Sequence, residues 1–204
     1  GTRWETERIV IKPYAAMGAI HAPLDALFDV DAKRRLVADE IASIRCDVSH
    51  SAYHHGWWQP ERPLTPIGAQ MNIGYALAVA TIDRAAMVAQ FAPSRIDADD
   101  VWELLARVTV HHDPALDVDS ASNRPRTRIA VRFTDGQCIE VERKASRAIE
   151  SPQSNDEIAQ KYRTLTSGLI STGRQTAIEE MVRKLETLAD MRELIALLAP
   201  PVRS

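Results

Sequence analysis

Alternating apolar and polar residues predict a small β-sheet in the first two thirds of the chain. Residues 42–48 alternate with a period of two, which is typical of a half-buried strand. Residues 127–142 alternate in the same way on both sides of Asp135 and Gly136, so they predict a β-hairpin. A shorter apolar run over residues 8–12 predicts one more strand.

The register of the hairpin follows from matching its charges and its apolar faces. A two-residue loop pairs Arg132 with Ile139, whereas a loop one residue longer pairs Arg132 with Glu140 and Val131 with Val141. Only the second arrangement places opposite charges together and apolar residues together. We therefore expect the longer loop or a bulge.

Helical periodicity predicts the other elements. Pro23 suits the first turn of a helix. Residues 67–82 are apolar nearly all round, which predicts one helix buried on most sides. Asp97 is placed to cap a further helix, and Ser154 with Glu157 has the spacing of a capping box at the start of a helical C-terminal third. The sum is an α+β fold: an antiparallel or mixed sheet packed by helices.

Composition narrows the class of protein. The 204 residues are 45% hydrophobic and 26% charged, which is enough to bury a core in one large or two small domains. The net charge of −3 argues against nucleic acid as a partner. The longest apolar run, Tyr75–Ala80, is too short for a membrane span, which needs about 20 residues. We interpret Cys46 and Cys138 as reduced core thiols of a cytoplasmic protein.

One local feature suits a small polycarboxylate. Lys12 ends the first apolar run, and His21 stands at the start of the next helix. Lysine supplies a compact cation and histidine a proton donor near neutral pH. The structural alternative is a surface lysine and a helix-capping histidine.

The histidines form a second feature. Residues 50–58 hold three histidines and two tryptophans in an aromatic loop, but no cysteine or acidic cluster completes a ligand set, so we expect no metal site. The alternative is a buried loop with hydrogen-bonded imidazoles. His111 and His112 are neighbours on a strand and point to opposite faces, so they do not easily share a metal.

Tyr75 on the apolar helix is the third feature. A buried tyrosine hydroxyl needs a hydrogen-bond partner. That partner is either a bound ligand or, in the structural alternative, an ordinary backbone carbonyl.

These residues lie in segments that resemble a known family. The segment ERIVIKPYAAMGAIHAPLDAL is similar to the Lys-Pro-Tyr…His segment of the MmgE/PrpD family, which includes 2-methylcitrate dehydratase, cis-aconitate decarboxylase and iminodisuccinate epimerase. The stretch HHGWWQPERPLTPIGAQMNIGYALAVATID resembles its second signature, and EIAQKYRTLTSG resembles the opening of its C-terminal helices. The resemblance runs from about Trp4 to Val202, and within the family it is strongest to cis-aconitate decarboxylase-like members.

The resemblance implies an architecture. The family pairs a large all-helical domain with a smaller α+β lid domain, and this chain corresponds to the lid, so the resemblance implies a single α+β domain over residues 1–204. The family's N-terminal helical domain is absent from this chain, so we expect it upstream or in trans. Its enzymes use no metal or organic cofactor, are usually homodimers, and hold the substrate between the two domains.

The resemblance also implies residue roles. By matched position, Lys12, His21 and Met17 bind a small polycarboxylate substrate, and Tyr75 and His21 are catalytic. Met17 stands where other members carry His or Cys. Because the family's catalytic Asp and His belong to the helical domain, we expect this chain to be inactive alone and to form part of a larger lyase. The alternatives are a dehydratase or epimerase of the same family, or a non-catalytic interaction and dimerisation module.

Overall fold

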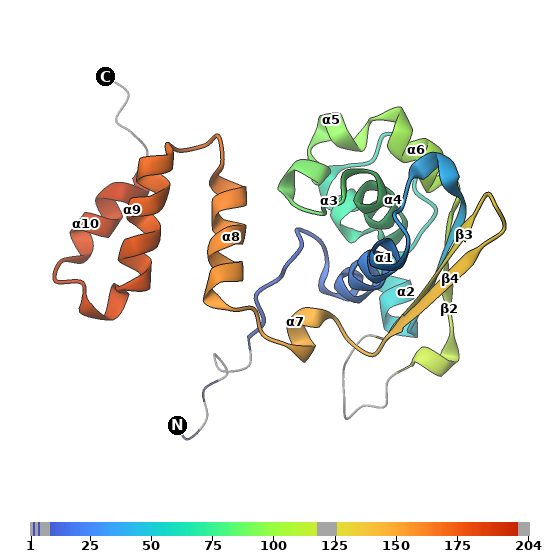
Figure 1. Ribbon diagram of the computed structural model, residues 1–204, viewed down its shortest axis with the longest axis horizontal. Helices are drawn as coiled ribbons and strands as arrows, with labels where there is room; N and C mark the ends of the chain where they lie inside the picture. Colours follow the sequence, from blue (N-terminus) through green and yellow to red (C-terminus); the bar gives the residue numbers. More distant parts are fainter. Residues whose placement is uncertain (1, 3, 5–8, 118–125, 200–204) are drawn as a thin grey trace. The chain divides into compact units, whose positions relative to one another are not determined.

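The chain divides into two compact units, Gly1–Pro152 and Gln153–Ser204 (Figure 1). The computed structural model describes all residues except 1, 3, 5–8, 118–125 and 200–204. Each unit is described below by itself.

The first unit is built on a mixed sheet, in agreement with the expected α+β class. Among the described residues the sheet has four strands in the order β2-β1-β3-β4. Strand β1 (Ile41–Val48) pairs parallel with β2 (Val108–His112) and antiparallel with β3 (Thr127–Phe133), which pairs antiparallel with β4 (Cys138–Arg143). Parallel pairing requires a crossover connection, and the helices between β1 and β2 supply it.

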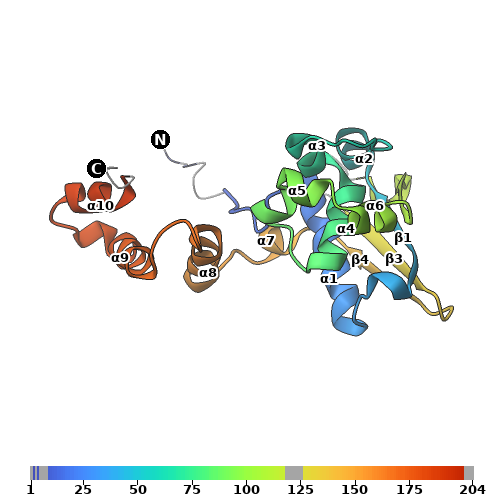
Figure 2. The ribbon, with the colours of Figure 1, turned by 90° about the horizontal axis from the view of Figure 1, so that it is seen from above.

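Two helices cover one face of this sheet (Figures 1 and 2). Helix α1 (His21–Lys33) packs on β3 and β4, while α4 (Ile73–Asp83) packs on β2, α1 and α6 (Asp99–Leu105). Every residue of α4 from Ile73 to Thr81 is buried, which explains its lack of a polar face. The other described helices of this unit are α2 (His50–Gly56), α3 (Pro66–Met71), α5 (Pro93–Ile96), α7 (Arg147–Glu150) and the 3₁₀ turns η2 (Gly18–Ile20), η3 (Ala38–Glu40), η4 (Val88–Phe91) and η5 (Pro114–Leu116).

The opposite face of the sheet is charged. Arg128 on β3 contacts Asp113 at 3.0 Å and Glu142 on β4 at 3.3 Å. The buried face carries the apolar residues of the alternating pattern, including Ile44 and Ile129. The period of two seen in the sequence therefore separates a packed face from a solvated one.

The apolar stretch 67–82 is not one helix. It breaks at Asn72, whose backbone is extended (φ −97°, ψ 117°) between α3 and α4. The Asn72 side chain accepts a hydrogen bond from the N–H of Tyr75 at 2.9 Å and donates one to the carbonyl of Trp58 at 3.0 Å. An asparagine that caps a new helix in this way competes with continuation of the old one.

Three further local predictions are wrong. Residues 9–12 form no strand, because among the described residues no neighbouring strand pairs with them; residue 8 lies outside the described residues. The aromatic loop begins instead as helix α2, since Ser49 caps it by accepting from the N–H of Ala52. The N-cap of α6 is Ala98, and the preceding Asp97 instead accepts a hydrogen bond from Arg62.

The hairpin has the expected longer loop but a different register. Residues 134–136 form the loop, and Gly136 adopts a left-handed φ of 91°, which glycine tolerates. The predicted pairing of Arg132 with Glu140 is wrong, because Arg132 lies opposite Cys138. The loop begins one residue earlier than expected, so the pairing shifts by two residues and apolar side chains still meet on one face.

The two cysteines differ. Cys46 on β1 is buried, as expected, whereas Cys138 at the start of β4 is exposed, so its assignment to the core is wrong. Burial raises the pKa of the Cys46 thiol to about 12, above its usual range.

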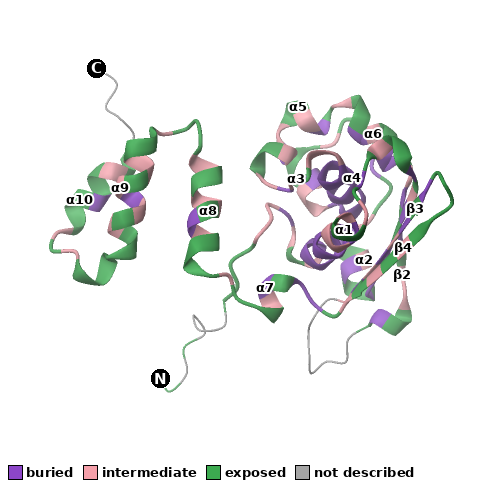
Figure 3. Cartoon of the chain, viewed as in Figure 1, coloured by how far each residue is buried: buried purple, intermediate pink, exposed green. Residues whose placement is uncertain are grey.

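The second unit is helical. Its described part contains α8 (Asn155–Thr166), α9 (Thr172–Arg183), the 3₁₀ turn η6 (Leu185–Thr187) and α10 (Met191–Leu198). The predicted capping box at its start is confirmed: Ser154 and Glu157 hydrogen-bond reciprocally. Most described residues of this unit are exposed, as Figure 3 shows.

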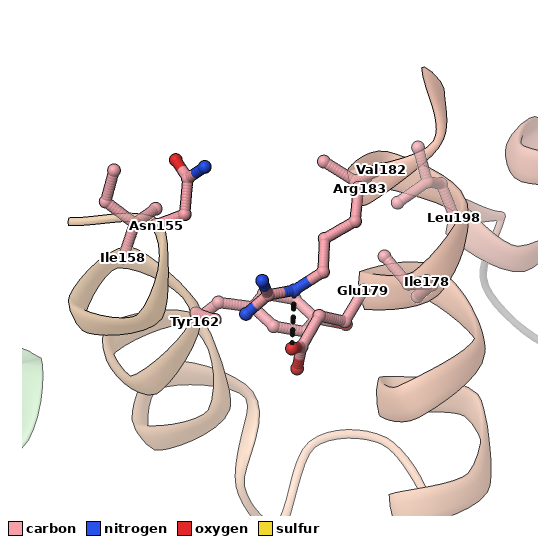
Figure 4. Close-up of a pocket in the computed structure, with 9 residues that line it drawn as sticks. Asn155, Ile158, Tyr162, Ile178, Glu179, Val182, Arg183 and Leu198 are labelled. Atoms are coloured by element: carbon pink, nitrogen blue, oxygen red, sulfur yellow. Dashed lines mark hydrogen bonds and ion pairs between the residues drawn. The ribbon is translucent and has the colours of Figure 1, made fainter. Parts of the chain in front are cut away.

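An apolar groove runs along the second unit (Figure 4). Its volume is about 580 Å³. The ion pair between Glu179 and Arg183, at 3.1 Å, lies beside it. The apolar side chains that line it come from all three helices: Ile158, Ala159, Tyr162, Ile178, Val182 and Leu198.

Candidate functional site

The segment that carries Lys12 and Met17 crosses the first unit just before α1. Its backbone is fixed at two points: the N–H of Ala15 donates to the carbonyl of Ala86 at 2.8 Å, and that of Met17 donates to the carbonyl of Gln70 at 2.9 Å. The Gln70 side chain returns a third bond, to the carbonyl of Ala15, at 3.0 Å. Helix α3 therefore holds this segment in place.

An open depression of about 310 Å³ lies along this segment. Its only cationic lining residue among the described ones is Lys12, and most of its other lining is apolar. A single ammonium beside an apolar floor suits a small anion with a hydrocarbon frame. The lining residues are Lys12, Tyr14, Ala15, Ala16, Met17, Ile67, Gln70 and Met71.

Lys12 and His21 meet at one backbone carbonyl. The ammonium of Lys12 donates to the oxygen of Ala16 at 3.4 Å, and Nε2 of His21 lies 3.2 Å from the same oxygen. His21 is the first residue of α1, is only 3% exposed, and is not among the residues that line the depression. The structure thus places His21 directly behind the segment that carries Lys12, with its ring nitrogen directed at that segment.

Met17 lines the depression. A thioether provides apolar contact but neither the proton donor of a histidine nor the reactive thiol of a cysteine. At this position the chain therefore offers an apolar contact surface and no charged group.

Tyr75 lies apart from the other three. Its side chain is fully buried in α4, it does not line the depression, and its hydroxyl donates to the carbonyl of Gln90 at 2.6 Å. Burial raises the pKa of this hydroxyl above its usual range, with smaller effects from the Arg95 and Asp83 charges. The geometry is that of the structural alternative, a core tyrosine bound to a backbone carbonyl.

Sequence reasoning missed Tyr14 and Asp25. The hydroxyl of Tyr14 donates to Oδ1 of Asp25 at 2.7 Å, and the Tyr14 ring lines the depression beside Lys12. Asp25, near the start of α1, is 1% exposed. The sequence gives little signal of this burial, since Asp25 stands four residues before Asp29, a spacing that is typical of a solvated acidic helix face.

The histidines gather at one end of the sheet. The rings of His50 and His54 lie 4.2 Å apart, that of His112 lies 5.3 Å from His50, and Asp117 accepts from His112 at 3.0 Å. His54 is exposed on α2, so the expected buried loop is wrong. Among the described residues no group of three or more His, Cys, Asp or Glu side chains is arranged to hold a metal ion.

No helix in the described part of the chain is both long enough and apolar enough to span a membrane.

Comparison with known proteins agrees with the fold and the segments described above. The chain is 34% identical, over 205 residues, to the cis-aconitate decarboxylase-like protein oryM of Aspergillus oryzae (strain ATCC 42149 / RIB 40). It is 31% identical, over 212 residues, to a cis-aconitate decarboxylase of Aspergillus terreus (strain NIH 2624 / FGSC A1156). These matches cover 98% and 100% of this chain but only 42% and 43% of the relatives, so the chain spans less than half of their length.

The family-level match covers most of the chain. Residues 14–187 match the MmgE/PrpD C-terminal domain, a range that includes the sheet, most of the second unit and every lining residue of the depression except Lys12. The chain therefore belongs to the MmgE/PrpD family.

Proposed function

We propose that this chain forms one wall of the active site in a lyase that acts on a small tricarboxylate, with cis-aconitate as the substrate. The observation that carries the proposal is the ammonium of Lys12 at the edge of an otherwise mostly apolar depression. The names of the two relatives above support the same substrate. The other wall, and the main catalytic acid, come from a helical domain of the same family upstream or in trans.

The chemistry explains why a cation is needed. cis-Aconitate loses one carboxylate as CO₂ when the bond to that carbon breaks. The electron pair passes through the alkene to the far carbon, where a proton forms the new C–H bond of itaconate. The two remaining carboxylates stay anionic throughout, so a fixed cation holds the substrate in place and a separate acid delivers the proton.

In this proposal the residues have distinct roles. Lys12 pairs with a carboxylate that is not lost, Met17 contacts the hydrocarbon frame, and His21 orients the segment from behind through Ala16. A catalytic role for Tyr75 requires that its hydroxyl leave the carbonyl of Gln90. A cytoplasmic homodimer without metal or organic cofactor is part of the same proposal.

The structure bears on one of the two alternatives but not on the other. A dehydratase or epimerase of the same family would use the same Lys12 contact, so only the product distinguishes it. A non-catalytic interaction module would use the apolar helix of residues 67–82 and the Trp57–Trp58 loop as its partner surface. Ile73 to Thr81 are buried within the first unit, whereas Trp58 is exposed. No described feature of α4 favours that reading.

Two experiments test the proposal. In the first, the ¹⁵N-labelled chain is titrated with cis-aconitate and with the saturated analogue tricarballylate. We expect amide shifts around Lys12 and Met17, an affinity reduced about tenfold by Lys12→Ala, and no change in Lys33→Ala, whose lysine lies exposed at the end of α1. In the second, a longer family protein that contains this chain is incubated with cis-aconitate, and itaconate is expected by NMR. No shifts around Lys12, or a hydrated or isomerised product, contradicts the assignment.

A further inference from the structure

One tyrosine connects the candidate site to a buried carboxylate. Tyr14 lies two residues after Lys12 and lines the same depression. Its hydroxyl donates to Oδ1 of Asp25 at 2.7 Å, and its ring meets that of His21 edge-on at 5.4 Å. This one side chain therefore contacts both the depression and helix α1.

Both oxygens of the Asp25 carboxylate have protein partners. Oδ2 accepts from the backbone N–H of Arg147, the first residue of α7, at 2.7 Å. The nearby guanidinium groups of Arg143 and Arg147 bind Asp29 instead. Burial and the neighbouring Asp25 charge raise the pKa of the Tyr14 hydroxyl above its usual range, so this group remains a proton donor.

The Tyr14 bond holds the part of the segment that the backbone bonds do not reach. Among the described residues, the backbone hydrogen bonds that anchor the segment begin at Ala15 and continue at Met17. Lys12 lies before both. Its ammonium reaches the carbonyl of Ala16, which His21 of α1 also contacts, and the Tyr14 hydroxyl adds a second link to α1 only two residues from Lys12. The place of the Tyr14 hydroxyl thus helps to set the position of the Lys12 ammonium over the depression.

We propose that Tyr14 and Asp25 are positioning residues that place Lys12 for contact with an anionic ligand. Neither touches the reacting atoms in this assignment; Tyr14 acts through Lys12, and Asp25 acts through Tyr14. The inference deepens the proposed function and rests on it for the identity of the ligand, but the positioning itself is a property of this chain.

A purely structural role for the pair makes a different prediction. If Asp25 only joins α1 to α7, loss of either of its two donors weakens the whole unit and affects the Lys12 segment no more than any other part. The second donor can be removed cleanly, because Arg147 is the first helical residue after Ser146, whose backbone (φ −70°, ψ 152°) accepts a following proline. Arg147→Pro and Arg147→Ala both lose the contact with Asp29, and only the proline variant loses the N–H to Asp25.

Amide hydrogen exchange on the 204-residue chain separates the two roles without any ligand. In Tyr14→Phe we expect exchange at Ala15 and Met17 to accelerate by roughly tenfold, while Ile44 in the sheet changes by less than about twofold. Arg147→Pro, relative to Arg147→Ala, should show no such selective effect. Equal acceleration at all of these amides, none at any, or the same selective effect in Arg147→Pro overturns the proposal. If Tyr14→Phe does not fold, Asp25→Asn, which keeps the shape but cannot accept from both donors, is measured against the same criteria.

A double-mutant cycle in a longer family protein that contains this chain provides the second readout. Tyr14→Phe should raise KM for cis-aconitate by about tenfold with little change in kcat, and should have no further effect when Lys12 is already alanine. Additive losses mean that Tyr14 does not act through Lys12 and overturn the proposal. If Lys12→Ala alone changes nothing, the proposed function fails, and the exchange experiment still decides the positioning role.

Discussion

Tyr75 and Gln90 are joined by a 2.6 Å hydrogen bond from the phenol hydroxyl to the backbone carbonyl. The bond ties the buried helix α4 to the 3₁₀ turn η4. Gln90 also donates to Asp83 at 3.1 Å, and Asp83 binds Arg95 at 2.6 Å. The hydroxyl that the family resemblance assigns to catalysis is thus part of a polar network inside the first unit.

Removal of that hydroxyl should destabilise the chain. Tyr75→Phe leaves the carbonyl of Gln90 without its present donor, so we expect a loss of about 1–3 kcal/mol in the free energy of unfolding, measured with urea. Tyr162→Phe is the control, because the hydroxyl of Tyr162 lies 3.3 Å from its carbonyl acceptor and should contribute less than about 0.5 kcal/mol. In a longer family protein, a stable Tyr75→Phe variant with kcat reduced by about 100-fold supports a catalytic role, and an unchanged kcat excludes it.

Substitution of Lys12 should affect ligand contact and not stability. Lys12 is exposed, so Lys12→Ala should change the free energy of unfolding by less than about 0.5 kcal/mol. If its ammonium holds a substrate carboxylate, kcat/KM of a longer family protein should fall by at least about tenfold. Lys12→Arg should restore part of this loss, because it keeps the charge but not the compact ammonium geometry. An unchanged kcat/KM in Lys12→Ala removes Lys12 from the site.

Two glycines predict opposite responses to alanine. A Cβ atom on Gly74 in α4 would lie 2.6 Å from the ring of Trp57, so Gly74→Ala should destabilise the chain by about 1–3 kcal/mol. A Cβ atom on Gly173 in α9 would meet no heavy atom within 4 Å outside its own helix backbone and chain neighbours. Gly173→Ala should therefore stabilise the chain by about 0.4–1 kcal/mol, because alanine lowers the conformational entropy of the unfolded chain. Thermal unfolding of the two variants beside the parent chain measures both effects. Equal responses would contradict the packing described for α4.

Stability should fall at alkaline pH. Burial raises the pKa values of Cys46, Tyr14 and Tyr75 in the folded chain. Their ordinary values are 9.0 for the thiol and 10.0 for the phenols, so above these values the unfolded chain loses protons that the folded chain retains. Each group therefore contributes stability that is complete below its ordinary pKa and decreases above it, by up to about 1.4 kcal/mol per pH unit.

Urea unfolding at about pH 8, 9.5 and 10.5 measures this decline. Cys46→Ala should remove the part that begins near pH 9, and Tyr14→Phe should reduce the slope above pH 10. Constant stability across this range would show that these groups are as accessible in the folded chain as in the unfolded one.

The sequence predicts the elements better than their junctions. Strand β1 follows from its period of two and helix α1 from Pro23 in its first turn, because both signals are local information. The break at Asn72 is not local information, since it depends on the carbonyl of Trp58 accepting the Asn72 amide across a loop. The run at residues 9–12 has strand-like composition but lacks a pairing strand in the described structure, and composition does not reveal that.

The candidate site shows the same limit. Lys12 and Met17 lie five residues apart in the segment that carries the family resemblance, and both line the depression. Tyr14 stands in that segment as well, but its importance depends on Asp25, eleven residues further along, and on the backbone of Arg147. Tyr75 was grouped with Lys12 by resemblance, whereas its hydroxyl is fixed by Gln90, a partner that the motif does not include.

The unequal environments of the two cysteines make the chain selectively addressable. A maleimide fluorophore would couple to Cys138 and spare Cys46, giving one dye per molecule without engineering. Because β4 is one of the two edge strands of the described sheet, that dye would sit where a docking polypeptide would extend the sheet, and its emission would report such an encounter directly.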